Sequence, residues 1–84
     1  MNLDLSYNQL TEIKSRNFLP KAGNLQNLGL QHNKISNIEP GSFSHLHGLE
    51  TLDLSGNELN EIGHKAFYGL VNCNQLTLSN NQIR

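Results

Sequence analysis

The chain has 84 residues, of which 36% are hydrophobic and 15% charged, and its formal net charge is −1. This length allows one small domain with a modest core, and the scattered Lys and Arg residues give no clustered basic surface for nucleic acid. No apolar run approaches the roughly 20 residues of a membrane-spanning helix, and the start of the chain has neither the basic nor the apolar region of a signal peptide.

Short stretches in which leucine alternates with another residue recur along the chain. They lie at residues 3–5, 28–30, 52–54 and 76–78. This period of two predicts short strands with one face turned inward. Because the surrounding residues repeat as well, the whole chain is predicted to be one repeat array. Its units are a partial repeat 1–24, full repeats 25–48 and 49–72, and a partial repeat 73–84.

Each predicted strand is followed by an asparagine at the same place in the repeat. These asparagines are Asn8, Asn33, Asn57 and Asn81, at intervals of 24 or 25 residues. The chain must turn away from the strand there, which frees backbone donors and acceptors inside the array. A side-chain amide has one acceptor and two donors, so the asparagines are predicted to form a structural ladder between neighbouring turns. The alternative is a ligand-binding role.

Beyond the asparagine, apolar residues return to the same interior in each full repeat. Ile38 and Ile62 are predicted to be buried there. A buried spine on the side opposite the strands is predicted for the phenylalanines Phe18, Phe43 and Phe67. A chain that revisits its core in this way is a solenoid in which each turn contacts its neighbours. Strands crowded on one side and longer returns on the other bend the stack, so the strand side is predicted to be concave.

Two places depart from the repeat. The segment from Phe18 to Leu25 is one residue longer than its counterparts, so the return around Leu19 and Pro20 is predicted to bulge. Cys73 stands where the other repeats have leucine and is predicted to be buried as a small hydrophobe, with a redox or crosslinking role as the alternative. Because Cys73 is the only cysteine, no disulfide can form within the chain.

Residues 25–46 follow the pattern L-x-x-L-x-L-x-x-N-x-I-x-x-I-x-x-x-x-F-x-x-L, and residues 49–70 match it. This pattern resembles the leucine-rich repeat family, in the roughly 24-residue form found in animal extracellular proteins. Toll-like receptor ectodomains are similar through Leu-Asp-Leu-Ser-Gly-Asn at 52–57 and Ala-Phe-Tyr-Gly-Leu at 66–70. The resemblance implies a right-handed curved solenoid, α/β or mainly β in class. Its short parallel strands would line the concave face, and loop or 3-10 returns would line the convex face.

For function, the resemblance implies a non-enzymatic protein-interaction module without a cofactor. It implies that the longer protein is an innate immune receptor of Toll-like type, extracellular or in the endosomal lumen, which binds a protein or microbial ligand. The concave face is a common recognition surface in such receptors. The candidates on it are Tyr7, Asn27, Gln31, His32, Thr51, Asp53, Ser55, Gln75, Thr77 and Asn80. Tyr7 is the only aromatic anchor, and the alternative is a solvated scaffold face with no partner.

Neither a catalytic nor a metal-binding site is predicted. His32, Asp53 and Ser55 are predicted to lie near one another on adjacent strands, but a flat strand surface supplies neither oxyanion donors nor a pocket. No cluster of Cys, His and carboxylate residues completes the four ligands of a metal site. The remaining histidines are predicted to be exposed to solvent: His45, His47 and His64.

The chain begins and ends inside a repeat, without the caps that close such arrays, which are cysteine-rich in secreted members of the family. Apolar side chains are therefore predicted to face outward, namely Leu3, Leu5, Leu10, Ile13 and Phe18 at one end and Leu76, Leu78 and Ile83 at the other. Because residues 76–83 occupy the same repeat phase as 3–10, copies are predicted to associate head to tail. A ring, a filament and an antiparallel dimer are the alternative assemblies. The alternative function is a stand-alone fragment that recognises a ligand on its concave face.

Overall fold

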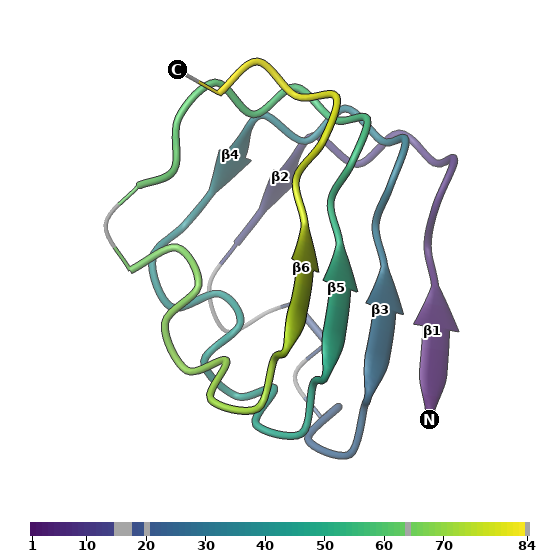
Figure 1. Cartoon of the computed structure of the whole chain (residues 1–84), viewed down its shortest axis with the longest axis vertical. Helices are drawn as coiled ribbons and strands as arrows, with labels where there is room; N and C mark the ends of the chain where they lie inside the picture. The colour runs from purple at the N-terminus through teal and green to yellow at the C-terminus, as the bar shows by residue number, and fades with distance from the viewer. Residues whose placement is uncertain (15–17, 20, 64, 84) are drawn as a thin grey trace.

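Short parallel strands stack side by side in the computed structural model, which describes residues 1–14, 18–19, 21–63 and 65–83 (Figure 1). In chain order the strands are β1 (Asn2–Asp4), β2 (Glu12–Ile13), β3 (Asn27–Gly29), β4 (Asn37–Ile38), β5 (Thr51–Asp53) and β6 (Gln75–Thr77). The main sheet is parallel with the order β1-β3-β5-β6, and β2 and β4 form a second parallel pair. The described residues form no helix, and so none long and apolar enough to cross a membrane. The predicted solenoid of parallel strands and loop returns is confirmed.

The inward side of the main sheet is a column of leucines. The register pairs Leu3 with Leu28, Leu28 with Leu52, and Leu52 with Leu76, so each turn places its leucine beside the one before. Leu28 and Leu52 are buried in the two middle turns, whereas Leu3 is half-buried and Leu76 exposed at the ends. Burial of one leucine stabilises a fold by roughly 1.5–3 kcal/mol, so the middle turns carry most of the stabilisation from this column.

The second sheet, β2 with β4, is not predicted by the repeat pattern. It pairs Ile13 with Ile38 and leaves Ile13 only 1% exposed. The prediction that Ile13 faces outward is therefore wrong, because the pairing places it inside the array beside Ile38. The backbone N–H of Glu39 donates to the carbonyl of Ile13 at 2.9 Å and ties the first two returns together. The hydroxyl of the buried Ser42 lies 2.8 Å from the carbonyl oxygen of Glu39 and 3.2 Å from that of Ile13, and it shares its single proton between them.

The third return does not join this second sheet. Ile62 occupies the position equivalent to Ile38, but it is 38% exposed, so the prediction that it is buried is wrong. Ala66 replaces Ser42 in this turn and has no hydroxyl with which to bind the preceding return. Glu61 and Ile62 form no strand beside β4, and no later return covers them within the described residues.

Three phenylalanine rings stack through the returns, as predicted. The ring centroids of Phe18 and Phe43 are 5.8 Å apart with an edge-on angle of 77°. Those of Phe43 and Phe67 are 6.2 Å apart and nearly parallel, at 7°. Phe43 is fully buried, and the two outer rings are half-buried. The spine therefore links all three returns.

His45 supports the first return, which the sequence predicts to bulge. Leu19 has a left-handed backbone with a φ of 50°. The Nε2–H of the half-buried His45 donates to the carbonyl oxygens of Phe18 at 2.7 Å and Leu19 at 2.8 Å. The prediction that His45 is solvated is therefore wrong, because its ring donates to two backbone carbonyls of the first return.

Replacing His45 by alanine is expected to lower the free energy of unfolding by about 1–2 kcal/mol, because two carbonyls in the first return lose their shared donor. Urea denaturation followed by circular dichroism measures the change. His47→Ala is the matched control, since His47 is exposed as predicted. Equal midpoints for the two variants would contradict the supporting role of His45. The predictions for Pro20 and His64 fall on positions outside the described residues.

Candidate functional site

The turn at the end of each main-sheet strand is held by an asparagine. The Nδ2 of Asn57, which is 6% exposed, donates to the carbonyls of Leu54 in its own turn and Leu30 in the preceding turn, both at 3.0 Å. Its Oδ1 accepts the N–H of Ile35 at 3.0 Å. The corresponding bonds are made by Asn33 and Asn81. These bonds set the spacing between the turns that carry the outward side of the sheet.

Asn8, the first of the four asparagines, acts locally. It is exposed, and its Nδ2 donates to the carbonyls of Leu5 and Ser6 in its own turn. The bond between the first and second turns comes instead from Asn33, whose Nδ2 also donates to Leu5 at 3.0 Å. Asn8 therefore closes the first turn without bridging to another.

The outward side of the main sheet, which we call the sheet face, carries four columns of side chains. The strand register and the backbone bonds that continue it align Asn2, Asn27, Thr51 and Gln75; Asp4, Gly29, Asp53 and Thr77; Ser6, Gln31, Ser55 and Ser79; and Tyr7, His32, Gly56 and Asn80. In the first column, Asn27 Nδ2 donates to Asn2 Oδ1 at 2.5 Å, and Thr51 Oγ1 donates to Asn27 Oδ1 at 2.6 Å. These side chains hold one another in place and use their donors on one another.

In the second column, two carboxylates stand on either side of Gly29. Hydrogen bonds from the hydroxyl and the N–H of Ser6 hold the pKa of Asp4 below its ordinary value. Asp53 Oδ1 accepts the N–H of Ser55 at 2.9 Å and its hydroxyl at 2.7 Å. Both carboxylates are thereby fixed beside Gly29, which contributes no side chain.

Two shallow depressions flank β5 on the sheet face. The larger, about 270 Å³, is lined by residues of β1, β3 and β5, including Asp4, Gly29 and Asp53. The smaller, about 200 Å³, lies between β5 and β6. Gln31 reaches over Gly29, and its Oε1 is buried without a hydrogen-bond partner in the described structure. The candidates that line these depressions are Asn27, Gln31, Thr51, Asp53, Gln75 and Thr77.

The fourth column lies at the edge of the sheet face. Tyr7, His32, Gly56 and Asn80 all have left-handed backbones, with φ between 57° and 69°. This conformation turns the chain out of the strand, so Tyr7, His32 and Asn80 lie beyond the strand ends, at the edge of the predicted recognition surface. The rings of Tyr7 and His32 stack with centroids 4.6 Å apart. A β-carbon at Gly56 would lie 2.6 Å from His32 Nδ1, so any larger residue there would displace the imidazole.

His32, Asp53 and Ser55 are not in a catalytic order. The hydroxyl of Ser55 donates to Asp53, whereas a base-activated nucleophile donates to the imidazole. The ring of His32 lies against Tyr7 and Gly56 instead. Within the described part of the chain, no group of three or more His, Cys, Asp or Glu side chains could hold a metal ion.

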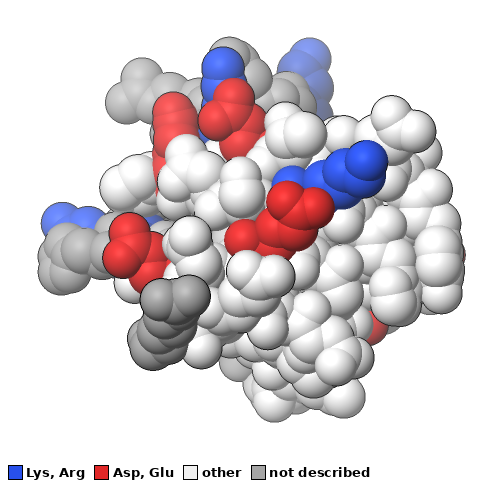
Figure 2. Space-filling view, turned by 90° about the horizontal axis from the view of Figure 1, so that it is seen from above, with Lys and Arg blue, Asp and Glu red and all other residues white. Residues whose placement is uncertain are grey.

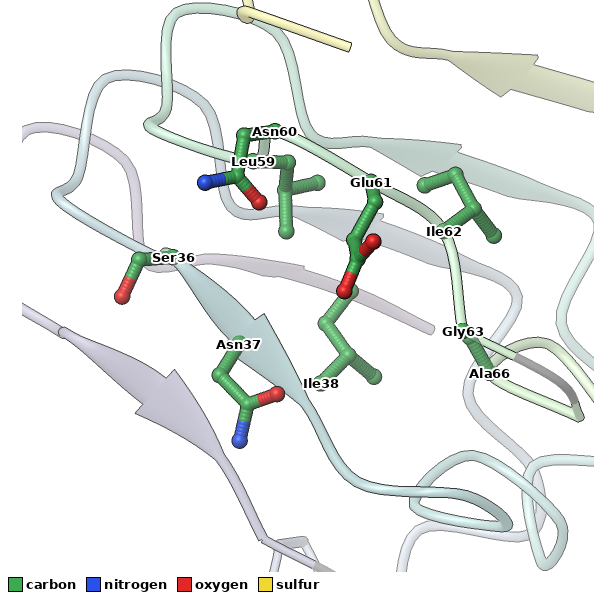
Figure 3. Close-up of a pocket in the computed structure, with 9 residues that line it drawn as sticks. All are labelled: Ser36, Asn37, Ile38, Leu59, Asn60, Glu61, Ile62, Gly63 and Ala66. Atoms are coloured by element: carbon green, nitrogen blue, oxygen red, sulfur yellow. The ribbon is translucent and has the colours of Figure 1, made fainter. Parts of the chain in front are cut away.

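A further pocket, about 90 Å³, lies away from the sheet face, between β4 and the segment 59–63 (Figure 3). It forms where the third return stays apart from β4, and Glu61 is directed into the space between them. Its volume is less than half that of either depression on the sheet face. The sheet face is therefore the larger candidate surface.

Charge is distributed unevenly over the molecule. Figure 2 shows charged side chains gathered over one side, while a broad part of the surface carries almost none. Among the columns of the sheet face, the only charged side chains are those of Asp4 and Asp53. No Lys or Arg stands in them, and Lys14 pairs elsewhere with Glu12 at 3.3 Å. The sheet face is therefore acidic.

Cys73 is half-buried, so the prediction that it is buried is wrong. It packs against the core from the last turn, and its Sγ–H donates to the carbonyl of Gln75 at 3.6 Å. No later turn covers it within the described residues, which is the physical reason for its exposure.

Residues 23–83 match the family model described as Leucine rich repeat. The chain is 39% identical to keratocan of Mus musculus, over 98% of this chain and 23% of keratocan. It is also 39% identical to Tsukushi-A of Xenopus laevis, over 99% of this chain and 24% of Tsukushi-A. The identity to Toll-like receptor 3 of Boselaphus tragocamelus is again 39%, over 98% of this chain and 9% of that receptor. The chain spans less than a quarter of the length of each of these relatives.

Proposed function

The chain belongs to the leucine-rich repeat family of animal extracellular proteins, and on that basis we propose that it recognises another protein through its sheet face. Repeat arrays of this kind present extended surfaces for protein interaction. The observation that carries the proposal is the pair of depressions on either side of β5, lined by polar side chains that hydrogen bonds hold in place. Side chains fixed before binding lose little freedom on binding, which favours association.

We further propose that the longer protein is a non-enzymatic receptor of Toll-like type, placed outside the cell or in the endosomal lumen, with a protein or microbial ligand. The 39% identity to Toll-like receptor 3 supports this assignment. The identity to keratocan and Tsukushi-A is equally high and supports assignment to other members of the family to the same degree. Antibody labelling of the tagged longer protein on intact and on permeabilised cells tests the location. Labelling confined to the cytosol would contradict it.

Selection of a phage-displayed random-peptide library on the immobilised chain tests the sheet face. Peptides enriched on the native chain are expected to lose binding to Thr51→Arg, because Thr51 lines both depressions. Ser36→Arg is the control, since Ser36 is exposed and lines the pocket beside β4. Enriched peptides that Ser36→Arg rejects and Thr51→Arg still binds would overturn the proposal, and so would the absence of enrichment.

End-to-end association of copies is a second candidate function, and the apolar edge at β6 favours it. Leu76 and Ile83 are 40% and 39% exposed there. The half-buried residues that complete the two edges are Leu78 near β6 and Leu3, Leu5 and Leu10 near β1. β1 and β6 are the two edge strands of the main sheet. Because the two edges share one repeat phase, β6 of one copy can pair in parallel with β1 of another and cover these side chains.

Two charge variants test this association by light scattering. Leu5→Lys disables the β1 edge and Leu78→Lys the β6 edge, so each alone is expected to be monomeric where the native chain associates. A mixture of the two is expected to form dimers and nothing larger, since each variant keeps one intact edge. Lys34→Ala is the control, because Lys34 is exposed in the turn beyond β3. A native chain that stays monomeric at high concentration would falsify the end-to-end pairing.

A further inference from the structure

The larger depression on the sheet face is lined by acceptors, one of which is covered and has no donor. Gln31 Oε1 is buried and has no partner among the residues the structure describes. A β-carbon at Gly29 would lie 2.9 Å from this oxygen and 3.2 Å from Asp4 Oδ1, so both oxygens lean over the same glycine. A buried acceptor without a donor is destabilising. A donor from outside the chain satisfies this oxygen when the Gln31 side chain turns away from Gly29.

The same depression carries negative charge on both sides. The register places Asp4 and Asp53 on the strands that flank Gly29. Neighbouring strands lie about 4.8 Å apart, so the strands that carry the two carboxylates, one on each side of Gly29, are about 10 Å apart. Asp53 accepts both of its hydrogen bonds on Oδ1, which leaves Oδ2 for another donor. No Lys or Arg stands in the columns of this face to neutralise the pair.

The neighbouring column does not supply the missing donor. Asn27 Nδ2 donates to Asn2, and the hydroxyl of Thr51 donates to Asn27. Both bonds run along the column, at 2.5 and 2.6 Å, and none of these donors bonds to Gln31. An external group must therefore combine positive charge with several donors spread over the width of the depression.

We infer that this depression receives the guanidinium group of an arginine from a protein partner. We call it the Gly29 notch, and it is formed by Asp4, Gly29, Gln31 and Asp53. A guanidinium is planar, always charged and has five donors, so it can reach acceptors on both sides of the glycine at once. An ammonium group is a compact charge and matches one carboxylate at a time. The inference rests on the proposed function, since it names the chemistry that the sheet face would recognise.

The test is an NMR titration of the isotope-labelled chain with a blocked glycine-arginine-glycine peptide. Weak, saturable binding is expected, with the largest shifts at the amide signals of Asp4, Gly29 and Asp53. The same peptide with citrulline in place of arginine keeps the shape of the side chain and removes its charge. It is expected to bind at least about tenfold more weakly, because charge-assisted hydrogen bonds are lost.

Two variants alter the notch itself. Gly29→Ala places a methyl group against Gln31 Oε1 and Asp4 Oδ1, where arginine would otherwise enter. Asp53→Asn removes one charge and keeps the Oδ1 that Ser55 binds. Each change is expected to weaken binding of the arginine peptide by about tenfold, with the citrulline peptide unaffected.

Gln31→Glu examines the buried oxygen directly. It keeps the shape of the side chain and exchanges the amide nitrogen for a second acceptor. Tighter binding of the arginine peptide is expected. Weaker binding would show that the amide turns its nitrogen toward Asp4, and it would overturn the acceptor arrangement on which the notch depends.

Matched controls separate the notch from the rest of the chain. Gly23→Ala repeats the glycine change at a position where the added β-carbon would meet no other atom within 4 Å. Glu61→Gln repeats the charge change in the pocket beside β4. Both are expected to bind the arginine peptide as the native chain does. Equal affinity for arginine and citrulline, or for Gly29→Ala and Gly23→Ala, would overturn the guanidinium site. The sheet-face proposal would still stand if library peptides continued to depend on Thr51.

Discussion

Replacing Asn57 by alanine is expected to lower the free energy of unfolding by about 2–3 kcal/mol. The carbonyls that Asn57 binds keep a second donor, from Asn33 or Asn81. The N–H of the fully buried Ile35 is left without its acceptor, because that acceptor is Asn57 Oδ1. In a domain of this size such a loss lowers the melting temperature by at least about 10 °C. Thermal unfolding followed by circular dichroism measures the shift.

Asn60→Ala is the matched control for this change. Asn60 has the same side chain, stands three residues further along the chain and is exposed. Its replacement is expected to change the free energy of unfolding by less than about 0.5 kcal/mol, as at other surface positions. Melting temperatures that fall equally in the two variants would show that the amide of Asn57 does not support the fold.

Replacing Phe43 by alanine is expected to have the largest effect, about 3–5 kcal/mol. Phe43 is fully buried, and its ring contacts the rings of Phe18 and Phe67. Truncation leaves a cavity in the middle of the spine and removes two aromatic contacts. Because small domains are stable by only about 5–15 kcal/mol, the variant is expected to unfold at a much lower urea concentration. Urea denaturation followed by circular dichroism measures this.

Tyr68→Ala provides the comparison for the loss of an aromatic ring. Tyr68 lies in the third return, is 62% exposed and has the Lys65 ammonium 5.8 Å from its ring centroid. Loss of that exposed contact is expected to cost no more than about 1 kcal/mol. If Phe43→Ala costs no more than Tyr68→Ala, the phenylalanine rings do not form the core of the returns.

The main sheet could be predicted closely because its strands repeat at a constant interval. Leu28 and Leu52 are 24 residues apart in the sequence and are paired in the sheet. The same interval separates Asn33 from Asn57, which make equivalent bonds to the preceding turn. In a solenoid each turn packs on the next, so sequence spacing translates directly into strand register.

The returns could be predicted less well because each depends on contacts of its own. Ile13 and Ile62 occupy equivalent positions, yet the first pairs in a sheet and is buried while the second is exposed. The next return covers Ile13 and bonds to it through the backbone N–H of Glu39, whereas no later return covers Ile62 within the described residues. His45 likewise departs from its predicted exposure because its ring donates to two backbone carbonyls of the first return.

For the candidate site, the repeat period is sufficient to place Asp4, Gly29 and Asp53 in one column, because register follows from spacing. Three-dimensional packing adds two further features of the sheet face. One is the side chain of Gln31, which folds over Gly29 and buries an acceptor without a donor. The other is the left-handed turn that takes Tyr7 out of the strand. Both depend on torsion angles: Gly56 and Asn80 in the sequence favour the left-handed turn, whereas the fold of the Gln31 side chain is set by its neighbours.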